Sequence, residues 1–224
     1  MMLEEIILKN KNELNKIMEA LSYCNFDDLD YETFESVLIY DFMNNYTQPI
    51  EYASGASKGV LIFKNLGFVI KIPFAYCDGC ELNGAEESEY GWDYCDQEIM
   101  RYEMALDAGV QNVFLEIKFF DYINGYPIYI QPYADIIAAL TDVEYKTLHS
   151  SSEEKDIEFV KHIDNIENYS YLNSQWEADL YILYGIEFYK KFKLFLEKNC
   201  IYDLTSDNIG YIGKNPILID YARI

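Results

Sequence analysis

Five polar residues occur in the order and the local settings that phosphoryl transfer from a nucleotide requires: Lys71, Glu98, Asp203, Asn208 and Asp220. This chemistry needs positive charge on the phosphates, carboxylate or amide oxygens on magnesium, and a base near the accepting hydroxyl. Lys71 lies in an apolar run, where a lysine is unfavourable unless a negative group meets it. Glu98, on the helix expected next, is its natural partner. Asp203 and Asn208 flank a short loop, and Asp220 ends a predicted strand.

A segment of small residues, Ser54-Gly-Ala-Ser-Lys-Gly59, leads into the first predicted strand. Small residues allow backbone N–H groups to approach a phosphate. The candidate nucleotide-binding residues here are Ser54, Gly55, Ser57, Lys58 and Gly59. Taken alone, the two glycines are better explained as ordinary turn residues. Lys71 alone could equally be a strand-edge lysine that reaches water.

Hydrophobic periodicity predicts the elements that position these residues. Helices are expected over 3–22, 31–44, 92–108 and 175–198, and a helical segment is expected to begin at 133–140. Short β-branched runs predict strands at 60–63, 67–72, 113–122, 126–131, 209–212 and 216–219. Asn124-Gly125 is a strong hairpin signal, and Gly109 is a plausible helix stop. We expect exposed loops at 75–92 and 148–154.

Composition limits the partners of this chain of 224 residues. Its formal net charge of −22 would repel phosphate backbones and anionic lipid, so direct binding to nucleic acid is not expected. No apolar run is long enough for a membrane helix, and the acidic start lacks the basic flank of a signal peptide. A cytoplasmic protein is therefore expected. The acidity indicates either a solvated surface or a mimic of nucleic acid that blocks a basic protein.

Five scattered cysteines, an odd number, argue against a disulfide framework and favour a reducing compartment. Cys77, Cys80 and Cys95 could supply three thiolates to zinc. A closed zinc site needs four ligands, and His149 and His162 are far along the chain. The simpler interpretation is a loop with free thiols.

Taken together, these motifs resemble the protein kinase-like family. That family has a glycine-rich loop, a third-strand lysine, a helix glutamate, an Asp-Leu-x-x-x-Asn loop and an Asp-Phe-Gly motif, in this order. The resemblance covers nearly all of residues 50–222. Ser-Gly-Ala-Ser-Lys leading into Val-Ile-Lys-Ile-Pro-Phe, with an end just past Ile-Asp-Tyr-Ala, looks like the minimal kinase-like proteins of bacteria and their phages.

The resemblance implies a role for each motif residue. Lys71 would hold the α and β phosphates of ATP, Glu98 would orient Lys71, and Asp203 would accept the proton of the substrate hydroxyl. Asn208 and Asp220 would hold Mg²⁺. Gln131 and Tyr133, at the position of the family's hinge, would face adenine. Glu103 is the second candidate for the helix glutamate.

Three departures from the family pattern bear on activity. Ile201 and Tyr202 replace the usual His and Arg, Thr205 stands where many members carry a lysine, and Asp-Tyr-Ala at 220–222 replaces Asp-Phe-Gly. Of these, Thr205 most directly threatens catalysis.

The expected fold class is α+β and protein kinase-like, with a mostly antiparallel N-lobe sheet, a regulatory-type helix and a truncated, mainly helical C-lobe without an activation segment. The expected domains are a helical extension (1–48), the N-lobe (49–132) and the C-lobe (133–224). The expected function is ATP- and magnesium-dependent phosphotransfer to a protein or small molecule. The alternative is a weak or inactive kinase-like binding protein, acidic and of the phage type, that blocks a basic host protein.

Overall fold

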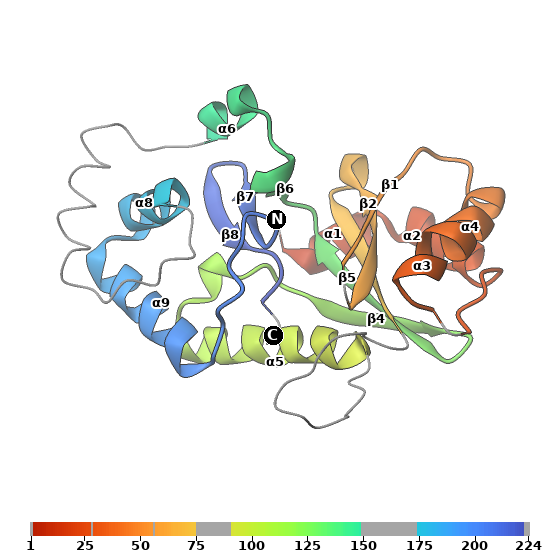
Figure 1. The fold of residues 1–224 in the computed structure, drawn as a ribbon, viewed down its shortest axis with the longest axis horizontal. Helices are drawn as coiled ribbons and strands as arrows, with labels where there is room; N and C mark the ends of the chain where they lie inside the picture. The colour runs from red at the N-terminus through yellow and green to blue at the C-terminus, as the bar shows by residue number, and fades with distance from the viewer. Residues whose placement is uncertain (1, 28, 56, 75–90, 149–173, 222–224) are drawn as a thin grey trace. The chain divides into compact units, whose positions relative to one another are not determined.

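A computed structural model describes residues 2–27, 29–55, 57–74, 91–148 and 174–221 (Figure 1). The fold is α+β, as predicted. It contains two compact units, and each is described by itself. The first comprises Met1–Ile99 with Glu116–Tyr133, and the second comprises Met100–Leu115 with Ala134–Ile224. Residues 1–48, predicted as a separate extension, thus belong to the same unit as the predicted N-lobe.

The first unit is built on a five-stranded antiparallel sheet in the order β1-β2-β3-β5-β4. Its strands are β1 (Glu51–Ser54), β2 (Lys58–Phe63), β3 (Phe68–Pro73), β4 (Lys118–Ile123) and β5 (Tyr126–Pro132). Asn124 and Gly125 both have positive φ, which is the geometry of a type I′ turn, and they join β4 to β5 as predicted. The strand expected to begin at residue 113 begins at Lys118 instead, because Val113 is the last residue of the short 3₁₀-helix η3 (Gln111–Val113).

The N-terminal helices are more broken than the periodicity predicts. The expected helix over 3–22 is two helices, α1 (Leu3–Lys9) and α2 (Lys11–Leu21). They are separated at Asn10, whose Nδ2 donates to the carbonyls of Ile6 and Leu66 at 2.9 and 3.0 Å. The second expected helix is α3 (Tyr31–Thr33), a π-helical segment η1 (Phe34–Ile39) and α4 (Tyr40–Asn45). Apolar spacing could not locate these breaks, because both sides of each break keep a buried face.

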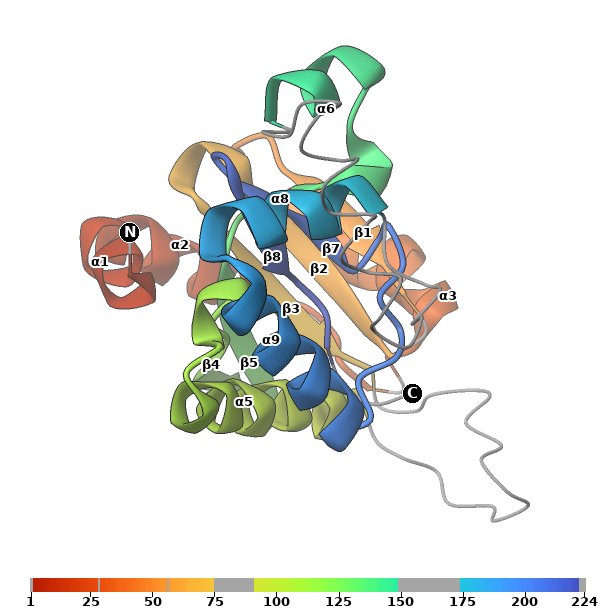
Figure 2. The same ribbon diagram turned by 90° about the vertical axis from the view of Figure 1, so that its left-hand side faces the viewer.

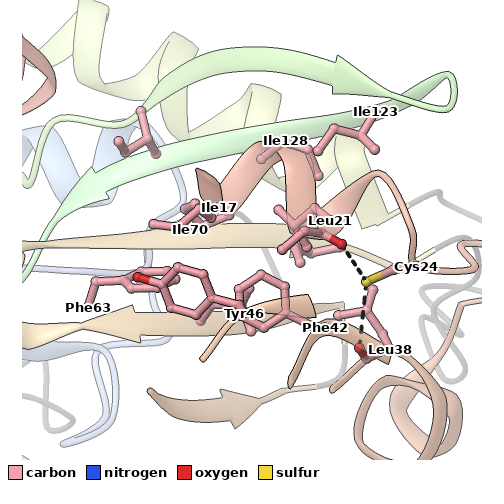
Figure 3. Close-up of a cluster of buried hydrophobic side chains, with 14 of the residues drawn as sticks. Ile17, Leu21, Cys24, Leu38, Phe42, Tyr46, Phe63, Ile70, Ile123 and Ile128 are labelled. Carbon is pink, nitrogen blue, oxygen red and sulfur yellow. Dashed lines mark hydrogen bonds between the residues drawn. The ribbon is translucent and has the colours of Figure 1, made fainter. Parts of the chain in front are cut away.

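These helices cover one face of the sheet and form the main core of the first unit (Figure 3). Figure 3 labels Phe63, Ile70 and Ile128 from three neighbouring strands of the sheet. The labelled helix and loop residues are Ile17, Leu21, Cys24, Leu38, Phe42 and Tyr46. Each fully buried aliphatic or aromatic side chain contributes about 1.5–3 kcal/mol of hydrophobic stabilisation. Side chains alternate across a strand, so Lys71 points to the opposite face from Ile70.

The helix α5 (Gly91–Ala108) begins near the predicted start and ends at Gly109, as predicted. Gly109 has φ +64, and its N–H donates to Leu106 O while that of Val110 donates to Ala105 O. These two bonds define a Schellman motif, in which glycine is favoured at the left-handed position.

The second unit contains a small antiparallel sheet in the order β6-β7-β8 together with several helices. Its remaining elements are β6 (Asp135–Ile136), η4 (Ile137–Ala139), α6 (Asp142–Leu148), α8 (Ser174–Tyr184), α9 (Ile186–Lys198), β7 (Ile209–Ile212) and β8 (Asn215–Leu218). The hairpin β7–β8 was predicted. The helical start at 133–140 was wrong, because Asp135 and Ile136 pair with Tyr211 and Gly210 of β7 before a 3₁₀ turn begins.

The long helix predicted over 175–198 is interrupted at Gly185, which has φ +80. Figure 2 shows the change of direction between α8 and α9. Only glycine adopts this conformation at low cost, so the chain bends there although the apolar spacing continues. Both helices still bury apolar side chains in one cluster, which includes Trp176, Leu180, Phe192 and Leu196.

No helix of the described residues is long and apolar enough to cross a membrane. The loops expected at 75–92 and 148–154 lie almost entirely outside the described residues.

Candidate functional site

In the first unit, one carboxylate contacts two lysines. Glu98 Oε2 lies 2.6 Å from Lys71 Nζ, which is the pairing expected from the sequence. Glu98 Oε1 lies 2.7 Å from Lys58 Nζ, which was not expected. The exposed fractions are 0% for Glu98, 2% for Lys71 and 5% for Lys58, so the three charged groups are removed from bulk water.

The geometry of the sheet explains this arrangement. Lys58 pairs with Pro73 across β2 and β3, and Lys71 pairs with Val60. The two lysines are therefore diagonal neighbours on one face, within reach of a common partner. That face is opposite to the N-terminal helices, and the first half of α5 supplies Glu98 to it. Glu103, the second candidate for the helix glutamate, is exposed on α5.

The predicted glycine-containing loop is the turn of the β1–β2 hairpin. Ser54 pairs with Gly59, and the Gly55 N–H donates to Lys58 O at 3.0 Å. The Ser57 carbonyl accepts from the Phe74 N–H at 2.8 Å. Lys58, expected in the loop, is instead the first residue of β2. The loop is therefore shorter than the sequence suggests.

Gly59 has a packing role. A Cβ at this position would overlap the ring of Phe34, which is itself fully buried. Gly59 also pairs with β1 on one side and with Ile72 of β3 on the other. Because Gly59 has no side chain, the ring of Phe34 can pack directly against its backbone. By contrast, a Cβ on Gly55 would meet no atom within 4 Å.

The predicted hinge residues occupy the end of β5. Gln131 is buried and pairs with Val69 across β3 and β5. Tyr133 follows the strand, and its N–H donates to Gly67 O at 2.9 Å. This N–H is already engaged within the sheet, so it does not point to a base in this conformation. Lys64 Nζ lies 5.2 Å from the centre of the Tyr133 ring, a cation–π contact.

In the second unit, Asn208 links the two predicted acidic residues. Its Nδ2 donates to Asp203 Oδ2 at 2.7 Å and to Asp203 O at 2.9 Å. Its carbonyl accepts the N–H of Ile219 at 2.8 Å, which extends the β7–β8 ladder and places Asp220 beside this group. The sequence separation of twelve residues between Asn208 and Asp220 is thereby closed by the hairpin.

The environment of Asp203 favours its protonated form. Partial burial raises the pKa of its carboxyl above the ordinary value of 3.8, and the nearby carboxylates of Asp220 and Asp207 raise it further. The bond from Asn208 acts in the opposite direction, because it stabilises the charged form. This shift brings the pKa of the Asp203 carboxyl nearer to the pKa of an effective general base.

The side chains of Asn208 and Asp220 carry oxygens of the kind that a magnesium ion takes as ligands. Because the amide nitrogen of Asn208 is committed to Asp203, its Oδ1 is the atom left for a metal. Mg²⁺ commonly takes one or two protein oxygens and completes its shell with phosphates and water. The Asp220 carboxylate is half-buried and would be the anionic ligand of such a site.

The residue after Asp220 is firmly held, which the sequence did not indicate. Tyr221 is buried, its hydroxyl donates to Leu115 O at 2.8 Å, and its ring packs edge-on against Phe114. Arg101 Nη1 donates to the Tyr221 carbonyl. Arg101 is buried on α5, and its helical spacing from Glu98 and Ala105, which share that face, was the signal available in the sequence. These contacts fix the backbone that carries Asp220.

The zinc alternative receives no support from the described residues. Cys95 is buried beside Ile117 and Tyr129, while Cys77 and Cys80 lie outside the described ranges. Across residues 2–74 and 91–148, apart from positions 28 and 56, and in 174–221, no group of three His, Cys, Asp or Glu side chains could hold a metal.

Comparison with known proteins identifies no relative. No family model matches the chain, and no curated protein is significantly similar to it.

Proposed function

We propose that this chain is an ATP- and magnesium-dependent phosphotransferase of the protein kinase-like fold, acting on a protein or small-molecule hydroxyl. The observation that carries the proposal is the buried contact of 2.6 Å between Lys71, on the third strand, and Glu98, on the helix that follows. In protein kinases a lysine of strand β3 and a glutamate of the next helix form this pair.

The order of elements supports the same proposal. Three antiparallel strands, a helix and two further strands occur along the first unit, and the pair joins the third strand to the helix. In the second unit, the contact of 2.7 Å between Asn208 and Asp203 supports the proposal, and these residues and Asp220 follow the order of the family's catalytic and metal-binding motifs.

Each residue then has one task. Lys71, oriented by Glu98, holds the α and β phosphates. Asp203 receives the proton of the attacking hydroxyl, which its raised pKa favours over a fully exposed carboxylate. Asn208 and Asp220 would hold Mg²⁺, and the bound ion would neutralise charge on the phosphates. Catalysis of this kind depends mainly on positioning and electrostatic stabilisation.

The decisive experiment is thermal unfolding of the purified protein with ATP, with and without Mg²⁺. A ligand at 100 times its dissociation constant adds about 2.7 kcal/mol to the free energy of unfolding. We expect ATP with Mg²⁺ to raise the melting temperature of the wild type and to have little effect on Lys71→Ala and Asp220→Ala. If the wild type does not respond to any nucleotide, the proposed function is wrong.

A second candidate function is that of a kinase-like binding protein of the phage type that blocks a basic host protein. Two observations favour it: Phe34 covers Gly59, and the Tyr133 N–H is engaged by Gly67. The net charge of −22 suits a basic partner. A cytoplasmic setting, in the host if the chain is phage-encoded, is part of both proposals.

The two candidates differ in which substitutions matter. If the chain is a blocking protein, its biological effect survives Lys71→Ala and Asp203→Ala and is lost when surface carboxylates are reversed to lysine. If it is an enzyme, Asp203→Ala abolishes phosphotransfer, while distant charge reversals on exposed residues such as Glu4 and Glu187 have little effect.

A further inference from the structure

Lys58 is a buried lysine that the kinase-like pattern does not explain. It starts β2, its exposed fraction is 5%, and its Nζ lies 2.7 Å from Glu98 Oε1. Lys71 holds the other oxygen of the same carboxylate at 2.6 Å. The two distances are nearly equal, so Glu98 is held symmetrically by an amine on each of two neighbouring strands.

Two contacts constrain the carboxylate in a way that one contact cannot. A carboxylate held through one oxygen can rotate about its terminal torsion, because that torsion has a broad energy profile. Contacts at both oxygens fix the plane of the group. Charge-assisted hydrogen bonds of this kind are roughly twice as strong as neutral ones. The position of the Lys71 ammonium therefore depends on whether Lys58 is present.

Removal of Lys58 changes Glu98 more than it changes the sheet. Lys58 is at the end of its strand, next to the hairpin turn, and the apolar core of the unit lies on the other face. Without Lys58, Glu98 Oε1 loses the charge-assisted hydrogen bond that it accepts, while Lys71 remains at Oε2. Glu98 would then reorient toward its remaining partners and move Lys71 with it.

We propose that Lys58 is a positioning residue: by holding Glu98 Oε1, it fixes the carboxylate that orients Lys71. The inference rests on the proposed function, since it concerns the same nucleotide site. In this inference Lys58 acts by contacting Glu98, whereas the sequence predicts that Lys58 contacts the nucleotide. The inference therefore predicts that the effect of Lys58 on nucleotide affinity passes through Glu98.

The test is a double-mutant cycle on the dissociation constant for ATP with Mg²⁺, measured by calorimetric titration. The variants are Lys58→Met, Glu98→Gln and the double variant. We expect Lys58→Met to raise the dissociation constant about tenfold in the wild-type background, which corresponds to about 1.4 kcal/mol. In the Glu98→Gln background the same change should alter it by less than about twofold, because interacting residues are non-additive.

The matched control is Lys193→Met. Lys193 is equally buried, with an exposed fraction of 6%, and its Nζ lies 3.0 Å from Glu177 Oε1 in the second unit. This variant breaks a buried lysine–glutamate pair outside the proposed site, so we expect affinity for ATP to change by less than about twofold. If Lys58→Met does not fold by near-UV circular dichroism, Lys58→Gln replaces it under the same criteria.

Three results would overturn the inference, and they are distinguishable. If the wild type binds ATP and Lys58→Met binds it equally well, Lys58 has no part in the site. If Lys58→Met weakens binding to the same extent in both backgrounds, Lys58 acts on the nucleotide directly. If the wild type itself does not bind ATP, the proposed function fails and the inference fails with it.

Discussion

The ring of Phe34 occupies the space that a side chain on Gly59 would fill. Phe34 lies in the π-helical segment η1 and Gly59 in strand β2, so an aromatic side chain of the N-terminal helical region is packed directly on the backbone beside the hairpin turn. Phe34 also contacts Phe74 and Tyr52. The N-terminal helices are thus an integral part of the first unit.

Gly59→Ala should destabilise the protein, because the new methyl group has no space. Overpacking a core costs about 1–3 kcal/mol. The measurement is the free energy of unfolding by urea titration. Gly55→Ala is the matched control, since a Cβ there meets nothing within 4 Å, and it should change stability by less than about 0.5 kcal/mol. Equal losses in the two variants would contradict the packing role. Adding Phe34→Leu to Gly59→Ala should give less than the sum of the single losses.

Cys200→Gly should stabilise the second unit. Cys200 has φ +52 and occupies the left-handed position of a Schellman motif at the end of α9, where its N–H donates to Glu197 O and that of Ile201 donates to Leu196 O. Relief of left-handed strain is worth about 1–2 kcal/mol, and the greater freedom of glycine in the unfolded chain removes about 0.4–1 kcal/mol of this. The net gain should be roughly 0.5–1 kcal/mol.

The equivalent position in α5 provides the reverse experiment. Gly109 has φ +64 in the same motif. Gly109→Ala should therefore lower the free energy of unfolding, measured in urea, by a similar amount. A neutral or stabilising result for Gly109→Ala would show that backbone strain does not decide stability at these helix ends.

Asp203→Asn should raise the melting temperature at neutral pH. The pKa of Asp203 is raised in the folded protein, so the folded state binds this proton more tightly than the unfolded chain. Stability contributed by the group therefore falls as pH rises from the ordinary value of 3.8 through the raised pKa. Asparagine does not ionise, so the variant avoids the stability that the wild type loses at high pH. The difference in melting temperature between variant and wild type should disappear when the pH is lowered below 3.8.

The control for this pH dependence is Asp27→Asn, a change to an exposed aspartate of the first unit. As a change to an exposed side chain, it should alter the melting temperature of the wild type only slightly at neutral pH. A gain for Asp203→Asn that persisted unchanged at low pH would rule out the electrostatic explanation.

The Cys24 thiol should resist alkylation in the folded protein. Burial raises its pKa to about 12, and Asp41 adds to the shift. Its Sγ lies 3.6 Å from the Ala20 carbonyl oxygen and 3.8 Å from the Leu38 carbonyl oxygen, so the thiol can donate to either. Figure 3 shows the contact with Leu38. Thiolate is the reactive form, so iodoacetamide at pH 8 should label the partly exposed Cys200 first and Cys24 only after unfolding. Peptide mass spectrometry measures the alkylation rates of Cys24 and Cys200. Equal rates in the folded protein would contradict the burial of Cys24.

Local signals in the sequence predicted several features correctly. The Asn124-Gly125 turn, the helix end at Gly109 and the contact of Lys71 with Glu98 each follow from the chemistry of one or two residues. A lysine in an apolar strand needs an anion, and the next helix supplied the acidic residue on the correct side.

The contact of Lys58 with Glu98 also has a signal in the sequence. Lys58, Val60 and Ile62 alternate along β2, so the period of two places Lys58 on the face of Lys71 once the strand is extended to residue 58. Because the β-branched run begins at residue 60, the sequence predicts the strand from there and leaves Lys58 in the preceding loop. The packing of Phe34 on Gly59 had no local signal, because it joins positions 25 residues apart through tertiary structure alone.

The breaks at Asn10 and Gly185 could not be placed from apolar spacing either. At Asn10 the interruption depends on a bond to the distant carbonyl of Leu66. At Gly185 it depends on a single backbone conformation, whereas the buried faces of α8 and α9 continue on either side.

Strand β3 is buried on both faces, and this affects how the chain selects its native pairing. A slip of one residue in the register of β3 would exchange its two faces. Lys71 would then enter the apolar core beside the N-terminal helices, while Ile70 or Ile72 would face Glu98. The first change leaves the buried Lys71 ammonium without its carboxylate, which is strongly unfavourable, and the second leaves Glu98 with Lys58 but without Lys71. The lysine–glutamate contact therefore opposes misfolding to the shifted sheet, whatever it adds to the stability of the correct one.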